Sequence, residues 1–219
     1  MPAHADQYPL PGGGIYGDWP KSGEIDVFEI RGNEQLVCGE NELGRSRSGS
    51  TLHWGMDQST NRWPMTHADH VTKKGQNDHA TSYHKYVLEW KKSGVRFLVD
   101  DEVLLDRPVP ENGFFDLGKF PEKYHNIWEN GTKMAPFDQE FYLIINISIG
   151  GFFFPDDCDN IWGEKPWKAR EIAEGTAARS FFFGGSENSP NSRKDFMRSW
   201  TDPTLRVKEV KIFQYEQNQ

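Results

Sequence analysis

Short strand-like segments separated by loops rich in glycine and proline run along most of this chain. Six segments are rich in β-branched and aromatic residues and are bounded by Gly, Pro, Asn or Asp: 24–31, 50–55, 82–93, 95–106, 140–151 and 204–216. Helices of ten or more residues, which a parallel α/β fold needs between its strands, have little support. The pattern therefore predicts an all-β fold of antiparallel strands, either a sandwich or a jelly roll.

Two of the local patterns are more specific. The segment 95–106, VRFLVDDEVLLD, predicts a hairpin that turns at Asp100 and Asp101. The segment 164–175 predicts a turn or two of helix after its proline. Loops are expected at 1–23 and at 176–200.

Composition limits the partners of the chain. The formal net charge of −8 argues against nucleic acid, whose phosphates require a basic stripe. Aromatic residues reach 14%, which fills a core and also suits a cleft that binds sugar rings. The longest apolar run, 141–155, is broken by polar and glycine residues, so no membrane span is expected.

The 219 residues contain no linker-like stretch, so we expect one domain over 1–219. Cys38 and Cys158 form one disulfide in an oxidising compartment or remain two buried thiols, and the sequence leaves both open. The first ten residues have no positive region followed by an apolar stretch, so they do not read as a secretory signal.

The segment GEIDVFEIRGN, residues 23–33, places three acids in six positions of the first predicted strand. Residues i and i+2 of a strand share a face, so Glu24 and Asp26 point together. Glu29 lies at an odd offset and would face the other way on a regular strand. One bulge near Val27 or Phe28 adds a residue and brings all three acids to the same face.

With that bulge, the Cα atoms of Glu24 and Glu29 are separated by about four strand rises, roughly 13 Å. Side chains that lean together would bring the carboxyl groups near the ~5 to 5.5 Å spacing of retaining glycosidases. Asp26 would then hydrogen-bond the nucleophile and keep the charge states of the other two acids apart. The alternative is a solvated edge strand whose acids serve solubility.

The segment WPKSGEIDVFEIRGN resembles the catalytic signature of glycoside hydrolase family 16, in the bulged E-x-D-x-x-E form of laminarinases. The resemblance continues in family order through STLHWG, YHKYVLEW, MAPFDQEFYLIINISIGGFFFPD, KPW and LRVKEVKIFQ. The chain is most similar to animal-type β-1,3-glucanases and to the related glucan-recognition proteins. The resemblance implies a concanavalin-like β-jelly roll of two curved antiparallel sheets with an open cleft for β-1,3-glucan.

By position, the resemblance implies that Glu24 is the nucleophile, Asp26 its assisting carboxylate and Glu29 the general acid/base. Trp19 would line the cleft beside the cleaved sugar. His53 either hydrogen-bonds near the acid/base or is a partly buried structural histidine. Two further residues match the family pattern and are read as structural first and as substrate-binding second: His84 and Asn146.

Where the chain departs from the family, further expectations follow. The family has several strands before its catalytic motif, so we expect this chain to lack them and to be poorly stable and weakly active alone. A calcium ion in some members uses an Asp where Lys208 stands, so no metal and no cofactor are expected. The stretch with His67, His70 and His79 lacks zinc-site spacing and is expected to be a solvated loop.

Two sequons occur, at Asn130 in an expected loop and at Asn146 in an expected strand, where a glycan would not fit.

Three functions remain open. The first is retaining endo-hydrolysis of β-1,3-glucan, favoured because both glutamates are present, whereas the recognition proteins have lost the catalytic acids. The second is a non-catalytic or weakly catalytic β-1,3-glucan-binding recognition protein. The third is transglycosylation by the same acids. The resemblance implies an extracellular monomer with a β-glucan partner.

Overall fold

The computed structural model describes residues 14–73, 76–161, 165, 168 and 203–215. The chain divides into two compact units, which are described separately. Unit 1 comprises Met1–Gln35 and Asn41–Ile145, and unit 2 comprises Leu36–Glu40 and Asn146–Gln219. The three acids and their neighbours all belong to unit 1.

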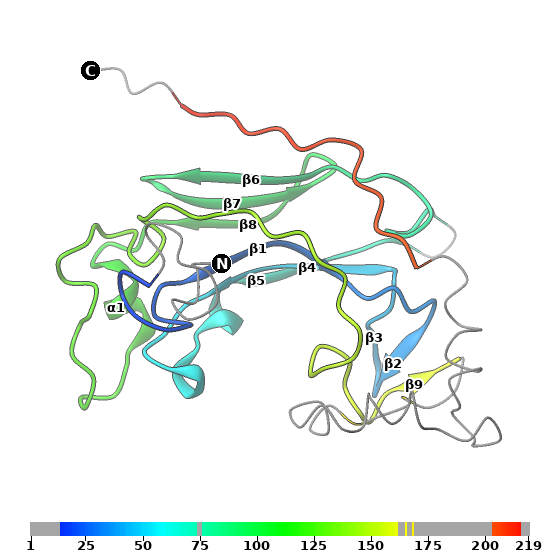
Figure 1. Cartoon of the computed structure of the whole chain (residues 1–219), viewed down its shortest axis with the longest axis horizontal. Helices are drawn as coiled ribbons and strands as arrows, with labels where there is room; N and C mark the ends of the chain where they lie inside the picture. The colour runs from blue at the N-terminus through cyan, green and yellow to red at the C-terminus, as the bar shows by residue number, and fades with distance from the viewer. Residues whose placement is uncertain (1–13, 74–75, 162–164, 166–167, 169–202, 216–219) are drawn as a thin grey trace. The chain divides into compact units, whose positions relative to one another are not determined.

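Unit 1 is built on two three-stranded antiparallel sheets (Figure 1). The first has the order β1-β4-β5 and is formed by β1 (Glu24–Ile30), β4 (Arg47–His53) and β5 (His67–Val71). The second has the order β6-β7-β8 and is formed by β6 (Tyr86–Lys91), β7 (Gly94–Val99) and β8 (Glu102–Pro108). Smaller elements are β3 (Asn41–Glu42), η1 (Gln58–Thr60), η2 (Trp63–Met65) and α1 (Gly113–Gly118).

The two sheets pack against each other, with β1 against β6 and β5 against β8. The rings of Phe28 on β1 and Tyr86 on β6 stack with centroids 4.4 Å apart. Leu52 on β4 and Phe97 on β7 are fully buried in the shared core. In the part of the chain that the structure describes, the strands are antiparallel and few helices occur, so the all-β prediction is confirmed.

Aromatic side chains fill much of this core, as the composition suggested. Trp54 is fully buried and meets the edges of Phe114 and Phe120 at centroid distances of 5.0 Å and 6.1 Å. Its indole Nε1–H donates to Thr66 Oγ1 over 3.0 Å, which satisfies the polar end of the buried ring.

The predicted hairpin is confirmed. Strands β7 and β8 pair with Phe97 opposite Leu105. Asp100 and Asp101 form the turn with φ values of 48° and 72°, which is the left-handed geometry of a two-residue type I′ connection. Aspartate tolerates this conformation better than most residues with a side chain.

Unit 2 contains a short antiparallel pair, β2 (Leu36–Cys38) and β9 (Asp159–Asn160). Cys38 and Cys158 form a disulfide beside this pair, which joins positions 120 residues apart in the sequence. The alternative of two free thiols is therefore not the one observed. Disulfides persist in oxidising compartments.

Two predicted strands were wrong in the part of the chain that is described. Neither 140–151 nor the described part of 204–216 forms a strand, and the apolar side chains of both are largely exposed. A strand requires a partner for its backbone N–H and C=O groups, and the β-propensity that marked these segments does not supply one.

The predicted helix 164–175 and loop 176–200 fall outside the described residues, apart from positions 165 and 168. The described residues of the predicted loop 1–23 form turns, as expected. Among the residues that are described, no helix has the length and apolar character needed to cross a membrane.

Candidate active site

The register between β1 and β4 places the three acids on one face. Glu24 pairs with His53 and Asp26 with Thr51, but the next pair is Glu29 with Gly49. Between these last two pairs β1 advances three residues while β4 advances two. This is the predicted bulge, with Val27 and Phe28 as the residues between the two pairs, and it restores Glu29 to the face of Glu24 and Asp26.

A buried hydroxyl holds the bulge. Ser50 on β4 is 2% exposed, and its Oγ–H donates to the carbonyl oxygen of Val27 over 2.8 Å. A bulge leaves part of the backbone ladder unpaired, so this bond gives an interrupted carbonyl its partner.

Ser50→Ala is expected to lower the free energy of unfolding by about 1–2 kcal/mol, because it leaves the Val27 carbonyl without its partner. Urea unfolding at neutral pH measures the change. Ser59→Ala, which removes an exposed hydroxyl, is the matched control and should stay within about 0.5 kcal/mol of wild type. A Ser50→Ala protein as stable as the control would show that the bulge does not depend on this bond.

Glu24 is buried, with 8% of its surface exposed. The indole Nε1–H of Trp19 donates to its Oε2 over 2.6 Å. Burial, and secondly the charge of Asp26, raise the pKa of Glu24 to about 7, against the opposing effect of the Trp19 hydrogen bond. Trp19 therefore contacts the acid itself and favours its ionised form.

Glu29 is the second acid with a perturbed proton affinity. Burial, and then the charge of Asp26, raise the pKa of Glu29, while His53 and Arg31 act in the opposite direction. Gly49 lies opposite in the register, and a Cβ there would come within 3.0 Å of the His67 ring. Glycine at this position keeps the backbone near Glu29 free of a clash.

His53 lies over the middle acid. Its Nε2 is 3.1 Å from Asp26 Oδ2, and its Nδ1 is 2.8 Å from Asn61 Nδ2. The rings of Trp19 and Trp63 flank it at centroid distances of 5.7 Å and 6.3 Å. Burial acts to lower the pKa of His53, but Asp26 and the other two acids outweigh it and the net shift is upward.

Asn61, Trp63 and His67 were not predicted from the sequence as residues of this site. Trp63 begins the short η2 turn and Asn61 lies just before it. So short a turn has no periodic pattern of apolar residues that could have predicted it. His67 Nδ1 lies 2.9 Å from the Thr51 hydroxyl, the residue that pairs with Asp26. The pairing of β5 with β4 carries His67 to this face, and that pairing was not predicted.

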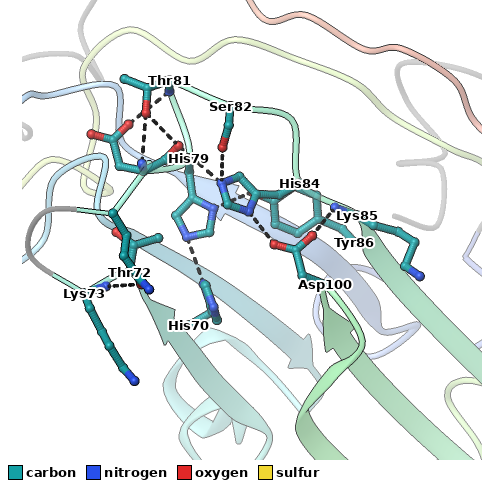
Figure 2. Close-up of polar contacts among 12 residues, drawn as sticks. His70, Thr72, Lys73, His79, Thr81, Ser82, His84, Lys85, Tyr86 and Asp100 are labelled. Atoms are coloured by element: carbon teal, nitrogen blue, oxygen red, sulfur yellow. Dashed lines mark hydrogen bonds and ion pairs between the residues drawn. The ribbon is translucent and has the colours of Figure 1, made fainter.

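The predicted loop around the histidines is wrong for His67–Val71, which form β5. Three histidines form a polar cluster with Tyr86 and Asp100 (Figure 2). His70 Nδ1 lies 3.1 Å from His79 Nε2, His79 Nδ1 lies 2.7 Å from Tyr86 Oη, and His84 Nδ1 lies 2.6 Å from Asp100 Oδ2. Burial, followed by the charges of His84 and His70, lowers the pKa of His79 to about 4.

Two predicted binding residues are not among the contacts of the acidic face. His84 contacts Ser82, Asp78 and Asp100 through hydrogen bonds, which supports a structural role. Asn146 belongs to unit 2 and is exposed, so the argument that a strand excludes a glycan there was wrong. Contact of either residue with substrate stays a prediction.

One group of three donors for a metal ion occurs among the described residues, and it belongs to the same site. The donor atoms of Glu24, Asp26 and His53 lie within 4.8 Å of one another. Glu24 already accepts a hydrogen bond from Trp19, and His53 already contacts Asp26 and Asn61. The absence of a metal at this site stays a prediction.

Comparison with known proteins adds independent information. Residues 15–136 match the model of a family described as glycosyl hydrolases family 16. A beta-1,3-glucan-binding protein of Penaeus monodon is 36% identical over 209 residues, which is 94% of this chain and 51% of that protein. Glucan endo-1,3-beta-glucosidase A1 of Niallia circulans is 32% identical over 147 residues, which is 66% of this chain and 17% of that protein.

The chain therefore spans about half the length of the first of these relatives and less of the second. Among solved structures, the laminarinase catalytic domain from Thermotoga maritima matches 46% of this chain and 34% of its own, at 21% identity and a TM-score of 0.35. A similarity of that size carries no argument about the site.

Proposed function

Because the chain belongs to glycosyl hydrolase family 16, we propose that it hydrolyses β-1,3-glucan with retention of configuration at the anomeric carbon. One observation carries the proposal: the bulge sets Glu24, Asp26 and Glu29 on one face, where burial raises the pKa of both glutamates. Two carboxyl groups of unequal role beside one scissile bond are what retaining hydrolysis requires.

In the first step, the Glu29 carboxyl gives its proton to the glycosidic oxygen as the bond from that oxygen to the anomeric carbon breaks. The Glu24 carboxylate attacks the anomeric carbon and forms a glycosyl ester. In the second step, Glu29 takes a proton from water, the water oxygen attacks the same carbon, and Glu24 leaves as a carboxylate. The net change is the addition of one water across one glycosidic bond.

The active form of the site then holds one proton on the pair of glutamates, and it is on Glu29. The indole of Trp19 favours ionised Glu24, because it donates to Oε2. Burial, and then the charge of Asp26, raise the pKa of both glutamates, so each ionises at a higher pH than an ordinary glutamate does. Activity then requires an ionised Glu24 and a protonated Glu29 at the same time, which predicts a bell-shaped dependence of kcat/KM on pH.

The proposal is tested by incubating the full chain with laminarin and following reducing ends, with insoluble curdlan as a parallel binding assay. Release of oligosaccharides whose first-formed anomer is β, observed by proton NMR, supports retaining hydrolysis. First-formed α-anomer contradicts retention. Supplying glucan oligosaccharide at high concentration reveals transglycosylation as products longer than the acceptor.

A second function is favoured by a different observation. The relative with 36% identity is named a beta-1,3-glucan-binding protein, so we also propose β-1,3-glucan binding without turnover as the alternative. Retention on curdlan with no reducing ends released would select it. In either case we propose an extracellular location, which the Cys38–Cys158 disulfide supports.

A further inference from the structure

The amide of Asn61 has a determined orientation. Its Oδ1 accepts the backbone N–H of Trp63 over 3.1 Å. A flipped amide would place an NH₂ group against that N–H, with two donors facing each other. The Asn61 Nδ2 group is therefore the one that faces His53.

That orientation determines where the proton of His53 lies. Asn61 Nδ2 can only donate, so His53 Nδ1, 2.8 Å away, accepts through its lone pair. The proton of the neutral ring is then on Nε2, 3.1 Å from Asp26 Oδ2, to which it donates. The chain of donors runs from Trp63 through Asn61 and His53 to Asp26.

The surroundings of His53 are otherwise strongly anionic. Asp26, Glu24 and Glu29 all lie on β1 and favour a charged imidazolium. From the side of η2, His53 meets the amide of Asn61 and the Trp63 ring, and from the N-terminal loop it meets the Trp19 ring. An imidazolium would present Nδ1–H to the Asn61 NH₂ group, so Asn61 opposes the charge that the acids favour.

We propose that Asn61 is a positioning residue that fixes the neutral tautomer of His53, with the proton on Nε2, and so limits positive charge beside Glu29. The proposal rests on the proposed function for its catalytic consequence. A positive charge on His53 would lower the pKa of Glu29, the group that must deliver a proton. The neutral tautomer still gives Asp26 a hydrogen bond without that effect.

The tautomer is measured directly on the wild-type full chain by nitrogen NMR with ¹⁵N-labelled histidine, and His53→Gln assigns the signals. At pH 8 we expect an unprotonated Nδ1 and a protonated Nε2 on His53. A protonated Nδ1 at that pH would overturn the proposal. This measurement requires neither turnover nor any change at Asn61, so it stands whether or not glucan is hydrolysed.

Asn61→Asp then replaces the donor that faces His53 Nδ1 by an acceptor, with almost no change in side-chain shape. The new carboxylate still accepts the Trp63 N–H, but its second oxygen accepts from Nδ1–H and favours the imidazolium. We expect the apparent pKa of His53 to rise by about one unit or more. Asn126→Asp is the matched control, because Asn126 Oδ1 accepts the Trp128 N–H over 3.0 Å in the same way, at a distance from His53 in the sequence.

An unchanged His53 titration in a folded Asn61→Asp protein, or an equal change in Asn126→Asp, would also overturn the proposal. If the chain hydrolyses laminarin, Asn61→Asp should move the basic limb of the kcat profile to lower pH by about half a unit or more, with KM little changed. If hydrolysis is absent altogether, the proposed function fails while the tautomer result is still decided by NMR.

Discussion

Glu24→Gln is expected to reduce the release of reducing ends from laminarin by about 10⁴-fold or more, with binding to curdlan retained. The amide cannot attack the anomeric carbon, so the glycosyl ester does not form. It keeps nearly the same size and can still accept the Trp19 N–H that now reaches Oε2. Glu102→Gln, which changes an exposed glutamate at the start of β8, is the matched control and should leave turnover unchanged.

The same variant should be more stable than wild type at alkaline pH. The pKa of Glu24 is raised on folding from an ordinary value near 4.5 to about 7, so between those values the folded chain binds more protons than the unfolded chain. Wild-type stability therefore falls as the pH rises through that window, by about 3 kcal/mol from this group. Glu24→Gln removes the ionisation, and thermal unfolding at pH 5 and pH 8 should show a smaller loss.

These two results together separate loss of chemistry from loss of structure. A variant that is inactive and less stable than wild type at pH 8 would point to misfolding instead. A variant that turns over laminarin at the wild-type rate would exclude Glu24 as the nucleophile.

Glu29→Gln is expected to slow laminarin hydrolysis by about 10³-fold, because the amide has no acidic proton to give to the leaving oxygen. Its defect should depend on the leaving group. A dinitrophenyl β-1,3-glucoside, whose phenolate leaves without a proton, should give a rapid burst of phenolate followed by slow hydrolysis of the ester. Glu24→Gln should show no burst with this substrate. If Glu24→Gln gave the burst and Glu29→Gln did not, Glu29 would be assigned as the nucleophile and Glu24 as the general acid/base.

The acidic face was predictable because its elements lie close together in the chain. The parity of Glu24, Asp26 and Glu29 required a bulge, and the pairs on either side of Ser50 confirm it. The hairpin at Asp100 and Asp101 is equally local, since two residues determine the turn. The alternation of side chains determines the first feature and the turn residues determine the second, and each depends on only a few neighbouring positions.

The remaining features depend on contacts between distant positions. Strand β5 exists because it pairs with β4, and its sequence HADHV has the polarity of a loop. Segment 140–151 shows the reverse, because its composition favours a strand and no described partner pairs with it. Asn61 acquires its place only when η2 brings its amide against the ring of His53, which no spacing in the sequence encodes.

The bulge also determines which changes in chain length β1 can tolerate. Inserting or deleting a residue elsewhere in a strand sends every later side chain to the opposite face. Deleting Val27 would instead leave a regular strand in which Phe28 alone opposes Ser50, and the acid after it would remain on the face of Glu24. Homologous sequences can therefore differ in length by one residue at this point and still place their acids on the same face of the sheet.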